Sequence, residues 1–210
     1  CMAIGMLVAW LLQQIKQKTT ATIVGAVLAG VVMIWFGGTT IARNAEWKND
    51  TSLFIADAVK VPNSALVNGN AGKAYIDMSE LPENKYREME LVRKAVPFLQ
   101  RALNTHNQYV NGYLNIGVAY FKLKEYDKAR DSWDMARKLY PSNPFLVRNY
   151  GLLGQMYYNE AMRFGANDPR KAIEYLQKAV EVDPSNPDYW YNLGGASFTI
   201  QDYKRAKEAW

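Results

Sequence analysis

Hydrophobic and polar positions divide the chain into two regions with different patterns. From Thr19 to Ala42 there are 24 residues without a charged side chain, centred on the apolar run from Ile23 to Phe36. After residue 42 apolar and charged positions alternate with a helical period, and all 20 acidic residues lie there. The pattern predicts an all-α protein with a membrane part over residues 1–42 and a helical array after it.

The charge-free segment predicts a transmembrane helix over residues 19–42. Such a helix would be about 36 Å long at about 1.5 Å per residue, which exceeds the roughly 30 Å hydrocarbon core of a bilayer. Lys16, Lys18 and Arg43 bracket the segment, and Trp35 lies near one end, where interfacial aromatic side chains gather. The alternative is a buried helix of a soluble protein, which seldom lacks a polar face over such a length.

A second apolar run, Met2 to Leu12, precedes this segment and is too short to span a bilayer alone. The polar residues 13–18 join the two runs, so we predict a transmembrane helical hairpin. No basic segment precedes the first run, which argues against a signal peptide. Because the chain starts at Cys1 and stops at Trp210 within a helical pattern, we expect it to be a fragment preceded by further spans. The flanking charges do not decide the orientation.

Large apolar, glycine and alanine positions recur at fixed offsets in the second region. Residues 110–143 carry them most completely, at Tyr113, Ile116, Gly117, Tyr120, Ala129, Trp133, Ala136 and Pro141. The offsets return in residues 187–210, where Ser197 replaces a tyrosine. With extra residues between their halves they return in 144–186 and 65–109. Residues 43–63 fit a linker with half a unit.

This spacing resembles the tetratricopeptide repeat (TPR), a helix pair of about 34 residues. The resemblance implies a right-handed TPR α-solenoid over residues 64–210, in which the glycine lets the paired helices approach closely. One pair cannot bury its apolar stripe alone, so neighbouring pairs must stack.

An asparagine precedes each motif glycine by two residues: Asn70, Asn115, Asn149 and Asn192. On a helical wheel Asn115 lies nearly opposite the packing stripe, beside Asn111, Val118 and Lys122. Stacking would align the four amides on one open face, where each can bond the backbone of an extended peptide. The arrangement resembles the asparagine ladder of nucleocytoplasmic O-GlcNAc transferases. We therefore predict peptide binding by the four asparagines with Asn111 and Lys122; the alternative is that asparagine is simply common in this slot.

Composition excludes several other functions. The net charge of +5 is scattered rather than clustered, so we expect no nucleic-acid partner. Cys1 is the only cysteine and His106 the only histidine, so we expect no disulfide, no metal site and no cofactor. Residues 69–74 lack the spacing of a phosphate-binding loop. The N-glycosylation sequon at Asn49 is interpreted as a chance match. The chain itself carries no evident catalytic residue.

The join between the two regions resembles the C-terminal part of polytopic membrane glycosyltransferases with TPR tails, the transmembrane O-mannosyltransferases. The resemblance rests on a final span followed by Arg43, Asn44, Trp47, Leu53, Phe54, Asp57, residues 62–64 and the repeats. It implies an integral membrane enzyme that uses a lipid-linked sugar, with the repeats on the periplasmic or lumenal side and catalytic acids in loops before this chain. The alternative is a non-enzymatic, membrane-anchored TPR scaffold for envelope protein assembly.

Overall fold

The computed structural model describes residues 6, 10, 18–47, 49–165 and 167–210. Every regular element in these ranges is a helix, and none of the described residues lies in a strand. The chain divides into two compact units, with the boundary after Leu53. This boundary falls inside residues 43–63, the segment assigned above to a linker and half unit. The two units are described separately.

The first unit contains the long helix α2, Lys18–Glu46, of 29 residues. Its stretch from Thr22 to Asn44 has a mean hydropathy of 1.9 and is 0% buried. Trp35 and Ile34 are among its large exposed side chains. Length and composition therefore allow α2 to cross a bilayer. Most of the predicted first helix, 2–12, and of the turn, 13–18, lies outside the described residues, so the hairpin stays a prediction.

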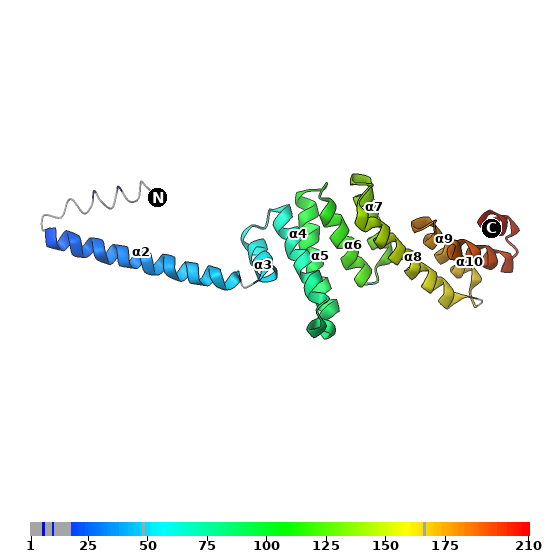
Figure 1. Ribbon diagram of the computed structural model, residues 1–210, viewed down its shortest axis with the longest axis horizontal. Coiled ribbons are helices and arrows are strands. Elements are labelled where there is room, and N and C mark those ends of the chain that lie inside the picture. The colour runs from blue at the N-terminus through cyan, green and yellow to red at the C-terminus, as the bar shows by residue number, and fades with distance from the viewer. Residues whose placement is uncertain (1–5, 7–9, 11–17, 48, 166) are drawn as a thin grey trace. The chain divides into compact units, whose positions relative to one another are not determined.

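The helix α3, Asp50–Lys60, crosses the boundary, and helix pairs follow it in the second unit. Figure 1 shows these pairs succeeding one another in chain order. Their helices are α4 Ala65–Ser79 with α5 Glu88–Thr105, α6 Val110–Lys122 with α7 Tyr126–Leu139, α8 Pro144–Phe164 with α9 Pro169–Val182, and α10 Pro187–Thr199 with α11 Tyr203–Ala209.

Local sequence sets where these helices begin. Asn143, Asp168 and Asn186 each cap a helix whose first residue is proline, and their side chains accept a hydrogen bond from a backbone N–H two or three residues later. The side chain satisfies a free helical donor, and the proline needs no donor of its own at the first helical position. Asn143 and Asn186 thus fix where the third and fourth helix pairs begin, and Asp168 fixes where the second helix of the third pair begins.

Glycine and a large side chain fit together within three of the pairs. A Cβ on Gly117 would lie 2.2 Å from Trp133 Nε1, and one on Gly194 would lie 2.2 Å from Trp210 Nε1. The Trp133 indole donates to the carbonyl of Leu114 at 3.1 Å, and Trp210 donates to Tyr191 at 3.2 Å. A Cβ on Gly72 would likewise collide with the Leu99 side chain. In these pairs the glycine does allow the close approach that the repeat pattern predicts.

The third pair departs from this arrangement. A Cβ on the expected glycine, Gly151, would meet nothing within 4 Å, whereas one on Gly154 would lie 3.0 Å from Tyr189. The prediction that Gly151 is a close-packing glycine is therefore wrong. The helix α8 has 21 residues against 13 in α6, and its buried residues follow a stripe shifted around the helix.

The first helices of the pairs form the inner layer of the stack. The helix α6 packs against α4 and α8, and the rings of Tyr158 of α8 and Tyr189 of α10 pack in a tilted arrangement with their centroids 5.3 Å apart. The second helices α7 and α9 are joined instead by ion pairs between side chains, Arg130 with Glu181 at 2.9 Å and Lys178 with Asp127 at 2.8 Å. Stacked helix pairs form a superhelix with one layer inside, and the contacts between successive first helices make α4, α6, α8 and α10 the expected inner layer.

Candidate polypeptide-binding face

The open face, as used below, is the least buried side of α4, α6, α8 and α10. On α4 it consists of Leu66, Asn70, Lys73 and Asp77, and on α6 of Asn111, Asn115, Val118 and Lys122. The spacing of i, i+4, i+7 and i+11 places each set along one side of its helix. Asn111 is exposed, and Asn70 and Asn115 are half-buried. Three of the predicted peptide-binding asparagines therefore lie on this face.

The asparagines of this face differ in what their amides already bind. Within the described part of the chain, the side chains of Asn70 and Asn115 have no hydrogen-bond partner. The Asn192 amide donates to the Asp188 carbonyl at 2.8 Å and to the Tyr158 hydroxyl at 3.3 Å. Asn70 and Asn115 thus keep donors and an acceptor for a ligand, whereas Asn192 keeps only its acceptor.

Asn149 lies apart from the other three. It is 9% exposed and belongs to the buried stripe of α8, next to the buried Tyr150. The shift of that stripe turns a different row of α8 outward, which contains Phe145, Arg148 and Leu152. The structure therefore brings Asn70 and Asn115 to the open face and places Asn149 inside the packing.

Lys122 is held by acidic side chains of the preceding pair. Its ammonium lies 3.3 Å from a carboxylate oxygen of Glu80 and 3.2 Å from one of Glu88, and its side chain is 20% exposed. A lysine that is paired twice and largely covered has little charge left for a peptide. Its evident role is to tie α6 to the α4–α5 turn.

Sequence reasoning missed Arg148. It is exposed on α8 with Phe145 three residues before it and Leu152 four residues after it. The signal was the i, i+3, i+7 spacing of these three side chains. The predicted register of α8 placed Asn149 on the open face and therefore did not predict that Arg148 would lie there.

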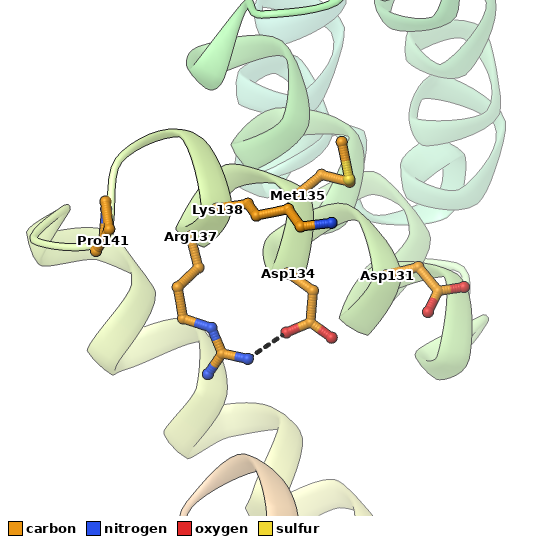
Figure 2. A pocket seen from close by; sticks show the side chains of 6 residues that line it. All are labelled: Asp131, Asp134, Met135, Arg137, Lys138 and Pro141. Atoms are coloured by element: carbon orange, nitrogen blue, oxygen red, sulfur yellow. Dashed lines mark hydrogen bonds and ion pairs between the residues drawn. The ribbon is translucent and has the colours of Figure 1, made fainter.

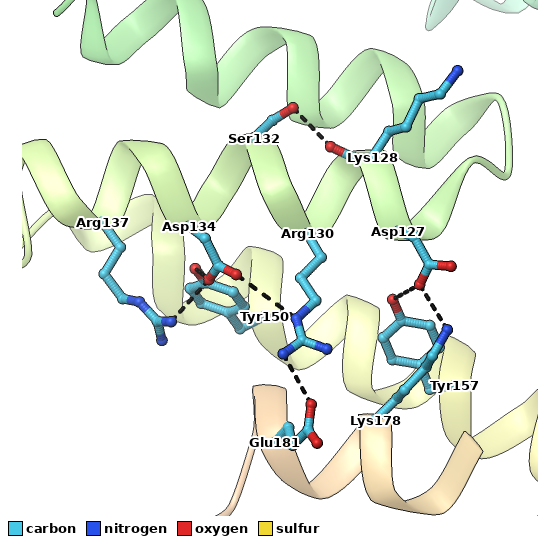
Figure 3. Close-up of polar contacts among 10 residues, drawn as sticks. All are labelled: Asp127, Lys128, Arg130, Ser132, Asp134, Arg137, Tyr150, Tyr157, Lys178 and Glu181. Atoms are coloured by element: carbon cyan, nitrogen blue, oxygen red, sulfur yellow. Dashed lines mark hydrogen bonds and ion pairs between the residues drawn. The ribbon is translucent and has the colours of Figure 1, made fainter. Parts of the chain in front are cut away.

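A polar seam joins α7 to α8 and α9 on the other side of the array (Figure 3). Asp134 accepts from the Tyr150 hydroxyl at 2.6 Å, and Asp127 accepts from the Tyr157 hydroxyl at 3.0 Å. The two aspartates are seven residues apart on α7, and the two tyrosines are seven apart on α8, so the pairs lie two turns apart on both helices.

The seam also shifts the pKa of its members. The hydrogen bond from Lys178 lowers the pKa of Asp127; desolvation opposes this, and the Tyr157 hydroxyl adds to it. Burial, followed by the hydrogen bonds to the aspartates, raises the pKa of Tyr150 and of Tyr157. These shifts keep Asp127 ionised and the two tyrosines neutral at neutral pH, which suits a structural joint between pairs.

A depression beside α7 lies near this seam (Figure 2). It is lined by Asp131, Asp134, Met135, Arg137, Lys138 and Pro141. The Arg137 guanidinium donates to Asp134 at 2.8 Å, which neutralises part of its lining. Among the described residues no three His, Cys, Asp or Glu side chains come together in a way that could hold a metal ion.

Comparison with known proteins identifies the repeats. Residues 110–143 and 163–210 match family models described as tetratricopeptide repeat, so these segments are TPR repeats and the array is a protein-interaction module. The chain is 35% identical over 94 residues to the heat-shock protein cognate co-chaperone sgt12 of Aspergillus fumigatus, covering 45% of this chain and 25% of that protein.

A second relative covers almost the whole chain. The human protein O-mannosyl-transferase TMTC3 is 23% identical over an alignment of 245 residues, covering 98% of this chain and 26% of that protein. The chain thus spans about a quarter of the length of these relatives. Among solved structures, a TPR protein of Thermus thermophilus is 21% identical with a TM-score of 0.40, covering 67% of this chain and 68% of its own. A MamA structure is 18% identical with a TM-score of 0.44, covering 85% and 86%.

Proposed function

We propose that the TPR array binds an extended polypeptide along the open face of α4, α6, α8 and α10. The observation that carries this proposal is the pair Asn70 and Asn115, which occupy the same place in successive repeats and have no partner in the described part of the chain. An unpaired amide on an inner face offers donors and an acceptor at a regular interval. A peptide backbone presents the complementary groups whatever its side chains are.

The expected contribution of each amide is modest. A hydrogen bond exchanged with water contributes about 0.5–1.5 kcal/mol net, so either Asn→Ala change should weaken binding by a few-fold. The double change Asn70→Ala with Asn115→Ala should weaken it by more than ten-fold, which corresponds to about 1.4 kcal/mol or more. Asn149→Ala should instead lower stability, because Asn149 is 9% exposed.

The test is the affinity of the chain for a panel of extended peptides, measured for wild type and for the double variant. The matched control is Asn104→Ala, because Asn104 is an exposed asparagine on the second helix α5. We expect the control to bind as wild type does. Equal binding by a folded double variant would show that the asparagines are incidental.

We further propose that this array is the acceptor-recognition tail of a protein O-mannosyltransferase that uses a lipid-linked sugar. The support is the similarity to TMTC3, which extends over 98% of the chain, together with the exposed apolar helix α2 before the repeats. In this proposal α2 anchors the array in the membrane, the repeats lie on the lumenal or periplasmic side, and catalysis belongs to another part of a longer protein.

A membrane-anchored scaffold without transferase activity is the alternative function. The two are separated by an assay of mannosyl transfer to a protein acceptor, using a longer protein that contains this chain. If the tail presents acceptors, the Asn70→Ala, Asn115→Ala variant should raise KM for the acceptor and leave the use of the sugar donor unchanged. No transfer by the wild-type protein would favour the scaffold.

A further inference from the structure

The open face carries three basic side chains in its first three repeats, and they are not equivalent. Lys73 pairs with Asp77 one turn later on α4, and Lys122 is held between Glu80 and Glu88. Arg148 on α8 is exposed and has no acidic partner within the described part of the chain. The first two charges are neutralised by the protein itself, so the third is the charge available to a ligand.

Arg148 lies between two apolar side chains that are also uncovered. Phe145 is 63% exposed and Leu152 is 45% exposed. Both lie on the side of α8 that carries Arg148, at i−3 and i+4. The open face of α8 thus presents a cation flanked by apolar side chains. The same face of α4 and α6 presents asparagine amides, and on α4 also an ion pair.

We propose that this part of α8 selects, within the bound polypeptide, an acidic side chain followed two positions later by a large apolar residue. The inference rests on the proposed binding of an extended polypeptide to the open face. The guanidinium of Arg148 would hold the carboxylate through two parallel hydrogen bonds, which is the geometry that arginine favours. The apolar residue would cover Leu152 and remove its surface from water.

The spacing of the ligand follows from helix and strand geometry. Arg148 and Leu152 are four residues apart, which is about 6 Å along a helix axis. In an extended chain, side chains on the same side are two residues apart, or about 6.6 Å. An acidic residue and an apolar residue at i and i+2 therefore match Arg148 and Leu152 when the peptide runs along α8.

The test uses synthetic peptides with acetylated and amidated ends, so that a side chain supplies the only carboxylate. One peptide carries Glu followed two positions later by Leu, the second replaces that Glu with Gln, and the third replaces that Leu with Ser. We expect the first to bind the wild-type chain about five-fold more tightly than either of the others, a size set by one partly exposed, charge-assisted contact.

The protein variants identify the residue responsible. With Arg148→Gln the preference for Glu over Gln should disappear, and with Arg148→Lys it should shrink. With the matched control Arg170→Gln, an exposed arginine of the second helix α9, it should remain. Circular dichroism of each variant checks that the fold is retained, which the exposure of Arg148 favours.

The outcomes separate this inference from the function on which it rests. If the wild-type chain binds none of the peptides, the proposed polypeptide binding is overturned, and the inference with it. If it binds all three equally, or if Arg148→Gln keeps the preference for Glu, polypeptide binding stands and the role of Arg148 is wrong.

Discussion

Two glycines that each follow an asparagine by two residues have opposite surroundings. Gly117 sits against the ring of Trp133, which is 1% exposed. Gly151 has open space where a side chain would be. Glycine in a helix costs about 0.5–1 kcal/mol relative to alanine, and this cost is offset only where the missing side chain permits a contact.

The first prediction compares alanine at these two positions. Gly117→Ala should lower the free energy of unfolding by about 1–3 kcal/mol, because the new methyl group forces Trp133 away from the Leu114 carbonyl. Gly151→Ala should raise it by about 0.5–1 kcal/mol. Urea unfolding followed by circular dichroism measures both. A destabilised Gly151→Ala variant would contradict the open surroundings of Gly151.

Single residues also mark the limit of what spacing predicts. The two-residue offset from glycine placed Asn70 and Asn115 on the open face, because those helices keep the regular register. It did not predict the burial of Asn149, because the motif offsets return in α8 at Tyr150, Leu153 and Gly154, three residues later than expected, and this register turns Asn149 into the packing. Nor could it predict the pairing of Lys122, because Glu80 and Glu88 belong to the preceding helix pair.

At the scale of elements, the joint between the second and third pairs depends on large side chains. Trp133 and Tyr150 meet edge to face at 6.4 Å, and so do Tyr126 and Tyr157. These rings fill the space between α7 and α8, and the aspartates bind the tyrosine hydroxyls at the rim. The division of the repeats into helix pairs was predictable from the sequence, since the breakers and apolar offsets recur. The seam was not, since it depends on how α7 and α8 align.

The second prediction concerns the tyrosine hydroxyls of the seam. Tyr157→Phe removes the donor to Asp127 and should lower the free energy of unfolding by about 1 kcal/mol. This loss should be small for a hydrogen bond to a charged acceptor, because the Asp127 side chain is 71% exposed. Tyr191→Phe is the control, since Tyr191 is 71% exposed, and its change should stay within about 0.5 kcal/mol.

The third prediction is the pH dependence of the same seam. The folded-state pKa of Asp127 is lowered, first by the hydrogen bond from Lys178. The stabilisation by Asp127 should therefore be fully present above the unfolded pKa of about 3.9 and be lost as pH falls through the lower folded value. The stability difference between wild type and Asp127→Asn, measured by urea unfolding, should be constant from about pH 5 to 7 and shrink below pH 4. The control is Asn104→Ala, an exposed position that carries no ionisable group, and its stability difference from wild type should not change over this pH range.

At the scale of the whole molecule, the chain combines an apolar helix with an array of helix pairs that forms its own compact unit. Each helix pair of the second unit packs mainly on its neighbours in sequence, so stability is the sum of pairs and joints. Among the described residues, the apolar stretch of α2 in the first unit is 0% buried. The length and composition of α2 allow it to cross a bilayer, which is the basis of the anchoring proposed above.

The last prediction tests this anchoring. Expressed with microsomes, the wild-type chain should stay with the membrane after alkaline carbonate extraction. Replacing Leu28 and Val31, which are 44% and 59% exposed near the middle of α2, with arginine should release it. Each arginine at the centre of a span costs about 2.5–3.5 kcal/mol of insertion free energy, and the two costs together should exceed the free energy gained by inserting the rest of the helix.

The control is Val59→Arg in α3, where the valine is 75% exposed but lies outside the apolar stretch. That variant should remain membrane-bound, and all three proteins should keep the helical signal of the array, because the repeats do not depend on α2. Retention of the double-arginine variant would show that another part of the chain holds it to the membrane. Release of the wild-type chain would remove the anchoring role of α2 and leave the TPR array as a module attached by other means.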